Sequence, residues 1–457
     1  MPSSQYFIVV GAGVFGATTA LGLARLGHRV TVLERSPDGY AAPDSASNDI
    51  NKIIRSDYSN PHYELLAKWA IDAWKKDPLL AKYYHDTGFV LASRFNRNEG
   101  LEYVRTCLGR GGNKGASTSV HVELHHSDAA PYSSSALASP FSPSPYEITS
   151  RETINRAFPS SSHAHLGTTL ENLGTSSLGY CNPEGGWAEA GAATNAVLDQ
   201  AKALGAEVVG GVEASGLIFD TRPTKKPPRV KGVVTADSRQ FHADKVVLAP
   251  GAWMTSLLKQ LLPEDKMWQS LPNGPCRASA QTVLSFQLNE EARKRYHGTP
   301  VVLDFSTGFY VFPPNREGVV KCAVHGPGYH YPSPGKLTTD PADLPAYAGP
   351  SAQTATNTII PLGNSYRQQH QIEDHAPEHT ETLLRTLLYD IWPEIATLPQ
   401  AKRRVCWYSD SSSEDENWIF DWHPRVEGLF LAGAGSGHGF KVSVCAGSMR
   451  HATCDVC

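Results

Sequence analysis

The sequence predicts an α/β protein in which a Rossmann-like nucleotide-binding domain is interleaved with an α+β domain that carries a large mixed or antiparallel sheet. Three observations predict this fold. Residues 6–34 read as strand, glycine turn, helix and strand, which is a βαβ unit. Short apolar strands that lead into glycine recur at 246–249 and 429–432. Segments rich in strand-forming and aromatic residues lie between those two points.

The first unit comprises a strand at 6–10, a turn at 11–16, a helix to Leu26 and a strand at 29–34. Its first glycine makes the tight turn, its second lets the backbone approach a pyrophosphate, and its third allows close contact between helix and strand. The free N–H groups at the helix N-terminus bind phosphate. A carboxylate at the end of the second strand can bond the hydroxyls of a ribose. We therefore expect these residues to bind a dinucleotide: Gly11, Gly13, Val14, Phe15, Gly16, Glu34 and Arg35.

Further elements follow along the chain. The sequence predicts helices at 63–76, 189–204 and 380–392, and strands at 207–209, 230–235, 246–249, 301–313, 319–325 and 429–432. The strand at 246–249 leads into Gly251 and Trp253, and the last strand leads into the glycine-rich segment GAGSGHGF. The first motif fits NAD as well as FAD, because both cofactors contain ADP. The distant glycine-rich strand ends favour FAD, since segments far apart in the chain contact a long flavin.

The expected cofactor domain is discontinuous. We predict an FAD-binding domain from residues 1–88, 182–255 and 415–457, and a substrate domain from residues 89–181 and 256–414. A Ser/Pro-rich insertion at about 110–162 has neither helical nor strand periodicity, and we expect an irregular loop there, with a functional lid as the alternative.

Length and composition exclude several classes of protein. A chain of 457 residues is too long for one simple core, and its net charge of −4 is ordinary for a soluble enzyme. The sequence has no Lys/Arg stripe, so we expect no nucleic-acid partner. It also has no stretch of about 18 apolar residues, so we expect no membrane partner. The 8 cysteines are scattered and form no framework of paired CxxC motifs, so we expect free thiols and no metal site.

Several long segments together carry a resemblance to a known family. They are VVGAGVFGATTALGLARLGHRVTVLE, NDINKIIRSDY, EGGWAEAGAATNAVLDQAKALGAE, KVVLAPGAW, GVVKCAVH, RRVCWYSDSSSEDENWIFDWHP and GLFLAGAGSGHGFK. With them the chain resembles the monomeric sarcosine oxidase and fructosyl amino acid oxidase (amadoriase) family of flavoenzymes, especially its fungal saccharopine oxidase-like branch. The resemblance covers nearly the whole chain except the Ser/Pro-rich insertion and the last dozen residues.

This resemblance implies roles for particular residues at the flavin. Cys406, in VCWYSD, matches the cysteine that carries the flavin covalently in the family, although a buried structural cysteine is the reading for such a residue taken alone. Lys52 matches a basic residue near the flavin. The resemblance also implies contact between the cofactor and Val212, Gly251, Trp253, Gly435, Gly437, His438, Gly439, Phe440 and Lys441. A helix beginning near Phe440 would direct its dipole at the flavin.

The resemblance also implies a set of catalytic residues. Lys321 matches the lysine that serves oxygen activation, where an ammonium stabilises the anion formed from O2. Taken alone, such a lysine in a strand reads as a solvated edge charge. Arg55 and Lys441 match the two cations that bind the substrate carboxylate. The matches in the substrate pocket are Tyr310, Tyr408 and His325.

From these residues we expect FAD-dependent oxidation of the C–N bond of a secondary amine to an imine, with O2 as acceptor and H2O2 as product. The expected partners are a small amine substrate and O2, and the protein is expected to be a monomer. One alternative is a biosynthetic oxidase whose imine is captured within the substrate. Another is a degenerate or truncated flavin-binding protein, because residues 442–457 lack the periodicity of a packed helix. We expect a cytoplasmic protein, since the terminal DVC is no peroxisomal signal, with the peroxisome as the alternative.

Overall fold

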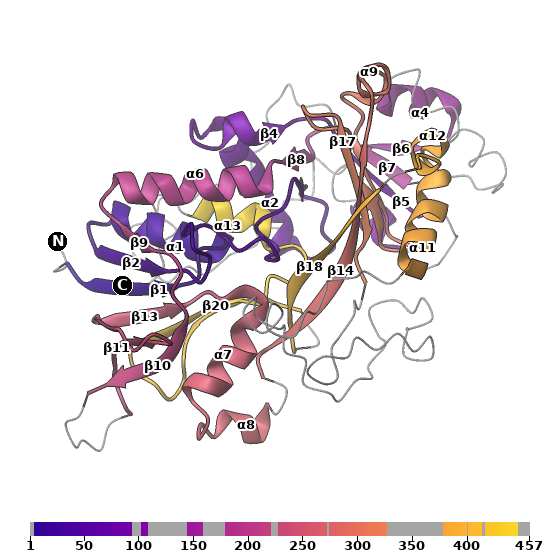
Figure 1. Ribbon diagram of the computed structural model, residues 1–457. Helices are drawn as coiled ribbons and strands as arrows, with labels where there is room; N and C mark the ends of the chain where they lie inside the picture. Colours follow the sequence, from indigo (N-terminus) through magenta and orange to yellow (C-terminus); the bar gives the residue numbers. More distant parts are fainter. Residues whose placement is uncertain are drawn as a thin grey trace.

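The computed structural model describes residues 4–93, 102–107, 144–158, 179–220, 227–271, 274–326, 378–399, 401–413 and 416–446. Figure 1 shows two main bodies, one on each side of strand β18. The described part of the Ser/Pro-rich insertion is residues 144–158, and the atypical residues 447–457 lie outside the described ranges.

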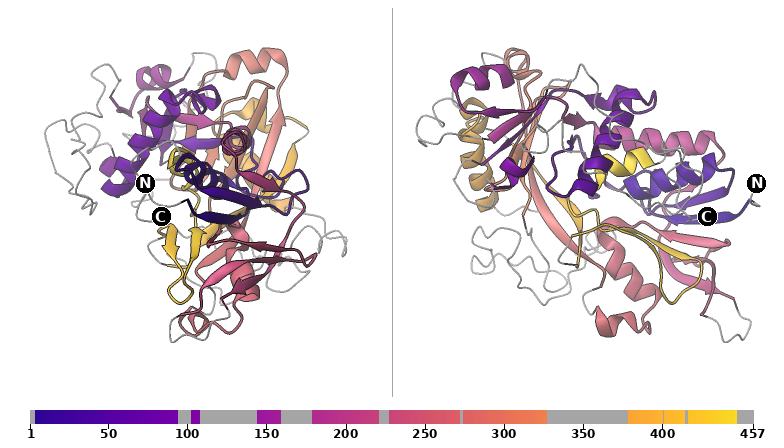
Figure 2. Two further views of the ribbon diagram at one scale, coloured as in Figure 1. Left: turned by 90° about the vertical axis from the view of Figure 1, so that its left-hand side faces the viewer. Right: turned by 180° about the vertical axis from the view of Figure 1, so that it is seen from behind.

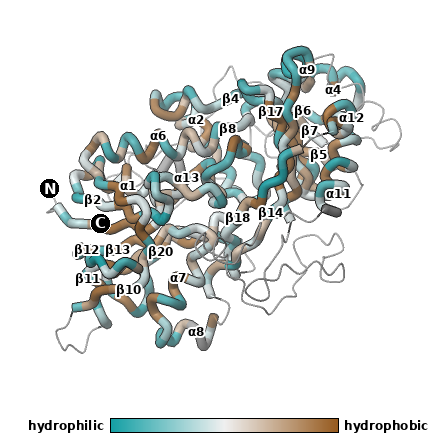
Figure 3. The backbone as a smooth tube through the Cα atoms, in the orientation of Figure 1, coloured by the Kyte–Doolittle hydropathy of each residue, from teal (hydrophilic) through white to brown (hydrophobic). Residues whose placement is uncertain are grey.

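A six-stranded sheet holds the nucleotide motif. Its order is β19–β20–β13–β1–β2–β9, with all pairs parallel except β19 with β20. The bounds are β1 (Tyr6–Val10), β2 (Arg29–Leu33), β9 (Glu207–Val209), β13 (Lys245–Leu248), β19 (Ile419–Trp422) and β20 (Leu429–Gly433). Segments from both ends and the middle of the chain therefore meet in one sheet. Their apolar residues give the brown colour around β1 and β13 in Figure 3.

The two faces of this sheet are buried by different layers, because successive side chains of a strand point to opposite faces. Phe7 and Val9 pack with helices α1 (Val14–Arg25), α2 (Pro61–Lys76) and α6 (Ala190–Ala203). Ile8 and Val10 pack with helix α7 (Met254–Leu261) and a three-stranded sheet. That sheet comprises β10 (Ala214–Phe219), β11 (Val230–Thr235) and β12 (Gln240–His242). The two views in Figure 2 show the helices and the small sheet on opposite sides.

An eight-stranded sheet forms the second body. Its order is β18–β14–β17–β16–β15–β5–β7–β6, and all pairs are antiparallel except β15 with β5. The bounds are β5 (Phe89–Ala92), β6 (Tyr146–Ile148), β7 (Gly179–Asn182), β14 (Cys276–Gln287), β15 (Val301–Asp304), β16 (Phe309–Val311), β17 (Val319–Val324) and β18 (Lys402–Ser411). The predicted α/β fold with a large mixed sheet is confirmed.

Successive side chains of each strand point to opposite faces of this sheet. One face packs against helices, and the other faces the first body. Leu284, Phe286 and Val320 pack under helices α11 (Glu378–Tyr389) and α12 (Pro393–Ala396). The opposite face carries a cluster that includes Cys406 and Tyr408. Because Gln281 is paired with Cys406 and Ser285 with Lys321, the cysteine and the lysine lie on the same face.

Short elements complete the described fold. A small sheet has the order β3 (Lys52–Ile54), β8 (Gly186–Ala188) and β4 (Tyr84–His85). The described 3-10 turns are η1 (Ala81–Tyr83) and η3 (Gly251–Trp253). The remaining helices are α4 (Arg151–Ala157), α8 (Met267–Ser270), α9 (Glu290–Tyr296) and α13 (Phe440–Ala446). Within the described residues no helix is long and apolar enough to cross a membrane. Five cysteines of the described residues are free thiols, namely Cys107, Cys181, Cys276, Cys322 and Cys406.

Two expectations need correction. Residues 144–158 of the insertion are not irregular, because they form β6 and α4, and Ser150 and Thr153 make a reciprocal capping box that starts the helix. The helix predicted at 380–392 ends at Tyr389, and Trp392 instead precedes α12. The long strands β14 and β18 were not predicted from strand patterns. The proposed domain boundaries stay a prediction, although the strands of the six-stranded sheet all lie within the residues assigned to the cofactor domain.

The close approach of α1 to its preceding turn gives a testable stability difference. A Cβ atom at Gly16 would overlap the backbone carbonyl of Gly11, whereas one at Gly22 in the same helix meets nothing within 4 Å. We expect Gly16→Ala to destabilise the protein by about 1–3 kcal/mol through overpacking. Gly22→Ala should be neutral or stabilising by up to about 1 kcal/mol. Thermal unfolding of the two variants measures this, and equal melting temperatures would contradict the packing described.

Candidate active site

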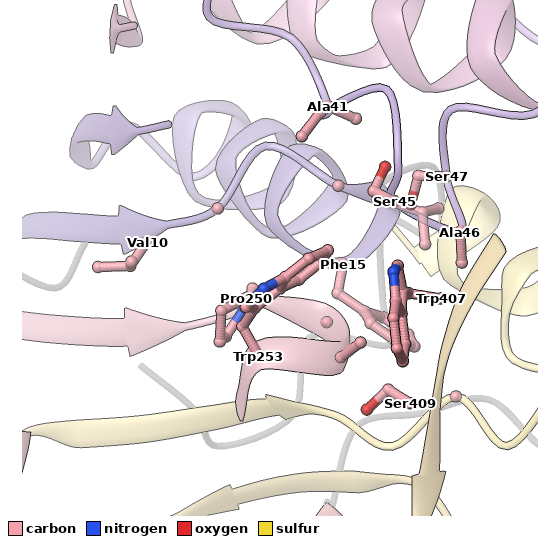
Figure 4. A pocket seen from close by; sticks show the side chains of 18 of the residues that line it. Val10, Phe15, Ala41, Ser45, Ala46, Ser47, Pro250, Trp253, Trp407 and Ser409 are labelled. Atoms are coloured by element: carbon pink, nitrogen blue, oxygen red, sulfur yellow. Dashed lines mark hydrogen bonds between the residues drawn. The ribbon is translucent and has the colours of Figure 1, made fainter. Parts of the chain in front are cut away.

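A long cavity with an empty volume of about 1340 Å³ runs between the two bodies. Val10, Pro250 and Trp253 line one end, and Ser47, Trp407 and Ser409 line the other (Figure 4). The predicted site residues that line it are Gly11, Gly13, Val14, Phe15, Glu34, Arg35, Lys52, Val212, Gly251, Trp253, Tyr408, Gly435, Gly437, Gly439 and Phe440. These residues come from distant parts of the chain, namely the first βαβ unit, residues 52, 212, 251–253 and 408, and the glycine-rich segment 435–440.

The end of the cavity at β1 and β2 fits the ADP part of a dinucleotide. Gly11 has φ +103°, and a Cβ atom there would lie 2.5 Å from the carbonyl oxygen of Ala249, so only glycine leaves this crossing free. Glu34 follows β2 directly and accepts hydrogen bonds from the N–H groups of Ala12 at 2.7 Å and Ser36 at 3.0 Å. Burial raises the pKa of this carboxyl. A fixed carboxylate facing the cavity matches the requirement of a ribose.

The N-terminus of α1 has a polar partner that the sequence did not indicate. Gly13 caps the helix without a side-chain hydrogen bond, and Val14 donates its N–H to Ser47 Oγ at 2.8 Å. Ser47 therefore satisfies one of the free N–H groups at the start of α1. Nearby, Arg35 stacks on Trp253, with its guanidinium carbon 3.8 Å from the ring centroid.

A buried charge cluster lies where β3 meets the eight-stranded sheet. Lys321 donates to Asp49 Oδ2 at 2.6 Å and to the carbonyl of Asn51 at 2.8 Å. Lys52 donates to the same Oδ2 at 2.7 Å, and Arg404 lies 3.4 Å from Oδ1. The Lys52 ammonium is also 3.9 Å from Cys406 Sγ. The structure thus brings Lys52, Lys321 and Cys406 together around Asp49.

The protonation states follow from burial and from these contacts. Burial alone raises the pKa of Asp49, but the ammonium groups of Lys321 and Lys52 outweigh it and hold the pKa well below its usual range. Burial lowers the pKa of Lys321 to about 8, Asp49 opposes that decrease, and Lys52 adds to it. Lys321 therefore remains mostly charged below about pH 8 and loses its proton above it.

A second pair of cations shares one aromatic ring. The Arg55 guanidinium lies 4.6 Å from the centroid of Tyr58, and the Lys441 ammonium lies 4.9 Å from it. Lys441 also donates to the Tyr58 hydroxyl and, at 2.9 Å, to the carbonyl of His438. Burial and then the charge of Arg55 lower the pKa of Lys441 well below its usual range. An anionic ligand would offset the repulsion between these two cations.

The carboxylate of Asp57 lies beside this pair. Its Oδ1 accepts hydrogen bonds from Tyr180 and, at 2.9 Å, from Asn182, whereas Oδ2 has no partner among the described residues. Arg55 donates to the backbone carbonyl of Asp57 rather than to the carboxylate. The guanidinium is therefore oriented by main chain.

The remaining predicted residues lie around these two clusters. The hydroxyls of Tyr310 and Tyr408 are 3.1 Å apart, and the rings of His325 and Tyr408 are 5.7 Å apart. His325 packs against Gly437, where a Cβ atom would overlap its ring. His438 does not line the cavity but packs among Tyr58, Tyr63 and Trp418, and burial lowers its pKa far below the usual range. The roles of these residues remain predictions.

Sequence reasoning missed Ser47, Asp49, Asp57 and Tyr58. Three of these lie inside NDINKIIRSDY, where two aspartates flank two basic residues. That mixture of signs beside short apolar runs was a usable signal, since buried cations need buried counter-charges. Ser47 gave no comparable signal, because a serine in a loop is ordinary.

Comparison with known proteins identifies the family. Residues 7–449 match the family described as FAD dependent oxidoreductase (DAO). The chain is 26% identical to the amino acid oxidase imqH of Aspergillus flavus, over 96% of this chain and 91% of that protein. It is 25% identical to the L-saccharopine oxidase of Schizosaccharomyces pombe, over 96% of this chain and 87% of that protein.

A solved structure shows the same fold. The deglycating fructosamine oxidase of Aspergillus fumigatus (Amadoriase II) superimposes with a TM-score of 0.67 at 27% identity, covering 97% of this chain and 84% of that chain. The chain therefore belongs to the DAO family of FAD-dependent oxidoreductases, and the resemblance to sarcosine, saccharopine and fructosyl amine oxidases is confirmed.

Proposed function

We propose that this FAD-dependent oxidoreductase oxidises the C–N bond of a secondary amine that carries a carboxylate, with O2 as electron acceptor. The observation that carries the proposal is the placement of two buried cations, Arg55 and Lys441, on the ring of Tyr58 near a separate cluster that contains Lys321 and Cys406. The Arg55–Lys441 pair suits an amino-acid carboxylate, and the Lys321 ammonium suits reaction with O2.

The reaction balances as two half-reactions. The substrate loses the hydrogen on the carbon next to its nitrogen and the hydrogen on the nitrogen itself, which together amount to two electrons and two protons. The C–N single bond thereby becomes the C=N double bond of an imine, and water then splits the imine into a carbonyl compound and a primary amine. O2 takes up two electrons and two protons to become H2O2.

The bound cofactor links these two halves, because FAD supplies the two-electron oxidant. The amine must react in its neutral form, since a protonated nitrogen has no lone pair to share with the carbon that is being oxidised. Activity should therefore fall as pH decreases through the pKa of the bound amine.

The cations of the carboxylate site position the substrate. Arg55 offers a planar fork for two carboxylate oxygens, and Lys441 offers a point charge from the first turn of α13. Both are held by neighbours within the chain, namely the carbonyl of Asp57 and the hydroxyl of Tyr58. Because a bound carboxylate would oppose the lowered pKa of Lys441 and favour its charged form, the site favours substrates with a free carboxylate over their amides and esters.

We also propose that Cys406 carries the cofactor covalently. Its thiol is fully buried, shares a face of β18 with the cavity-lining Tyr408, and has the Lys52 ammonium 3.9 Å from its sulfur. The adjacent residues Trp407 and Tyr408 line the cavity, which supports a link from this strand. Forming the S–C bond would remove the thiol hydrogen and one hydrogen of a methyl group of the cofactor, and the two electrons released would pass to O2.

A screen for O2 uptake and H2O2 release tests the proposed function. The amines are sarcosine, N-fructosyl amino acids, saccharopine and pipecolate, each compared with a primary amino acid and a decarboxylated analogue. We expect turnover of at least one secondary amine with a carboxylate, with one H2O2 formed per O2 consumed. Turnover confined to amines without a carboxylate would contradict the substrate assignment.

If Cys406 carries the flavin covalently, the flavin should stay with the protein after denaturation. In the parent protein the flavin should remain with the acid-precipitated chain and add its mass to the intact protein. Cys406→Ala should release the flavin into the supernatant, while Cys322→Ala, another fully buried cysteine, should retain it. A parent protein that loses its flavin on denaturation would contradict the linkage.

The carboxylate site predicts a loss of selectivity in Lys441→Met. Removing one of two buried cations should lower kcat/KM for the carboxylate substrate by about 10²- to 10³-fold, equivalent to about 3–4 kcal/mol. The primary amide of the same substrate should lose much less, because it carries no charge to bind. Equal losses for the acid and the amide in steady-state kinetics would show that Lys441 does not read the carboxylate.

A further inference from the structure

We propose that Asp49 is a positioning residue for the reaction with O2. Its buried carboxylate holds the Lys321 ammonium in place and keeps it charged, whereas the nearby Lys52 ammonium favours loss of the Lys321 proton. The inference rests on the proposed function, because it assumes that Lys321 is the group that meets O2. Asp49 itself touches neither reactant in this scheme and acts through Lys321.

The geometry supports this role because the Asp49–Lys321 pair is buried and is not a surface ion pair. Both side chains of the Asp49–Lys321 pair are almost fully buried, at 2% and 1% exposed. Lys321 uses two of its three N–H donors on Asp49 Oδ2 and on the Asn51 carbonyl, both from the loop before β3. The ammonium is therefore fixed from one side by a single segment of chain.

The groups that face Lys321 come from four elements. They are Asp49 and Lys52 from the loop and start of β3, Cys406 from β18, and Tyr310 from β16, while Arg404, also on β18, lies against Asp49. Phe312, which follows β16, places its ring centroid 4.8 Å from the ammonium. Three cations thus surround one carboxylate in an apolar setting, and the cluster keeps a net positive charge.

Charge on Lys321 matters because the first electron that reaches O2 creates an anion. A preset ammonium in a site without water stabilises that anion far more than it would in solution. Burial and Lys52 both favour loss of the ammonium proton, and Asp49 opposes them. Removal of Asp49 should therefore deprotonate Lys321 at neutral pH, and removal of Lys52 should protect its proton.

The experiment measures the protonation of Lys321 and the reoxidation rate separately in the purified holoenzyme. Heteronuclear NMR of ε-¹³C-lysine-labelled protein, with the resonance assigned by its absence in Lys321→Met, follows the titration directly. Stopped-flow mixing with O2, after photoreduction of the flavin with EDTA, gives the reoxidation rate without any amine substrate. Failure of the proposed amine chemistry would consequently not affect either readout.

The expected results have opposite signs in two variants. Asp49→Asn should lower the pH midpoint of Lys321 by about 1–3 units and slow reoxidation at about pH 7.5 by roughly threefold or more. Lys52→Met should raise the midpoint, and Asp49→Glu, which keeps the charge, should restore most of the parent behaviour. Asp265→Asn removes another buried carboxylate, which pairs with Arg425, and should leave the midpoint unchanged.

Several outcomes would overturn the proposal. An Asp49→Asn holoenzyme with the parent midpoint and reoxidation rate would show that Asp49 does not control Lys321. If Asp49→Asn does not fold with flavin, Lys52→Met decides alone, and a midpoint that is unchanged or lowered in it refutes the proposal. If the pH dependence of the reoxidation rate in the parent protein does not follow the NMR midpoint of Lys321, then Lys321 does not act in the O2 step. That result would also refute the proposal.

Discussion

The buried carboxylate of Asp49 is the interaction on which the site depends. Three cations from three elements surround it, namely Lys52, Lys321 and Arg404. Burying an unpaired ammonium costs several kcal/mol, so these side chains can share one interior only around an anion. Arg404 also donates to the carbonyls of Pro43 and Ser45, which fixes the loop before β3 to β18. One carboxylate therefore joins the nucleotide-binding body to the eight-stranded sheet.

The rest of the site follows from that junction. The same loop supplies Ser47 to the N-terminus of α1, so the phosphate end of the cavity and the lysine cluster are held by one segment. Strand alternation then places Lys321 and Cys406 on the face of the sheet that the loop covers. At the other end of β3, Arg55 reaches the ring that Lys441 also contacts. Two clusters of basic residues are thus separated by one short strand.

Much of this arrangement was predictable, and the remainder has identifiable causes. Periodicity and glycine spacing found the βαβ unit and the strands at 246–249 and 429–432, because local pattern specifies them. The long strand β14 was missed because CRASAQTVLSFQ is rich in small and polar residues, which tertiary pairing with β18 turns into strand. The resemblance pointed to the cations but not to Asp49, since a counter-charge is recognised only once its partners are seen together.

This FAD-dependent protein, in the function proposed above, takes electrons from a secondary amine with a carboxylate and gives them to O2. Anaerobic mixing of the purified yellow protein with one equivalent of such an amine tests this most directly, with the visible flavin absorbance as the readout. The account predicts that the absorbance bleaches and that admitting air restores it with release of one equivalent of H2O2. An absorbance that stays unchanged with every N-substituted amino acid tried, or a protein that purifies without flavin, would contradict it.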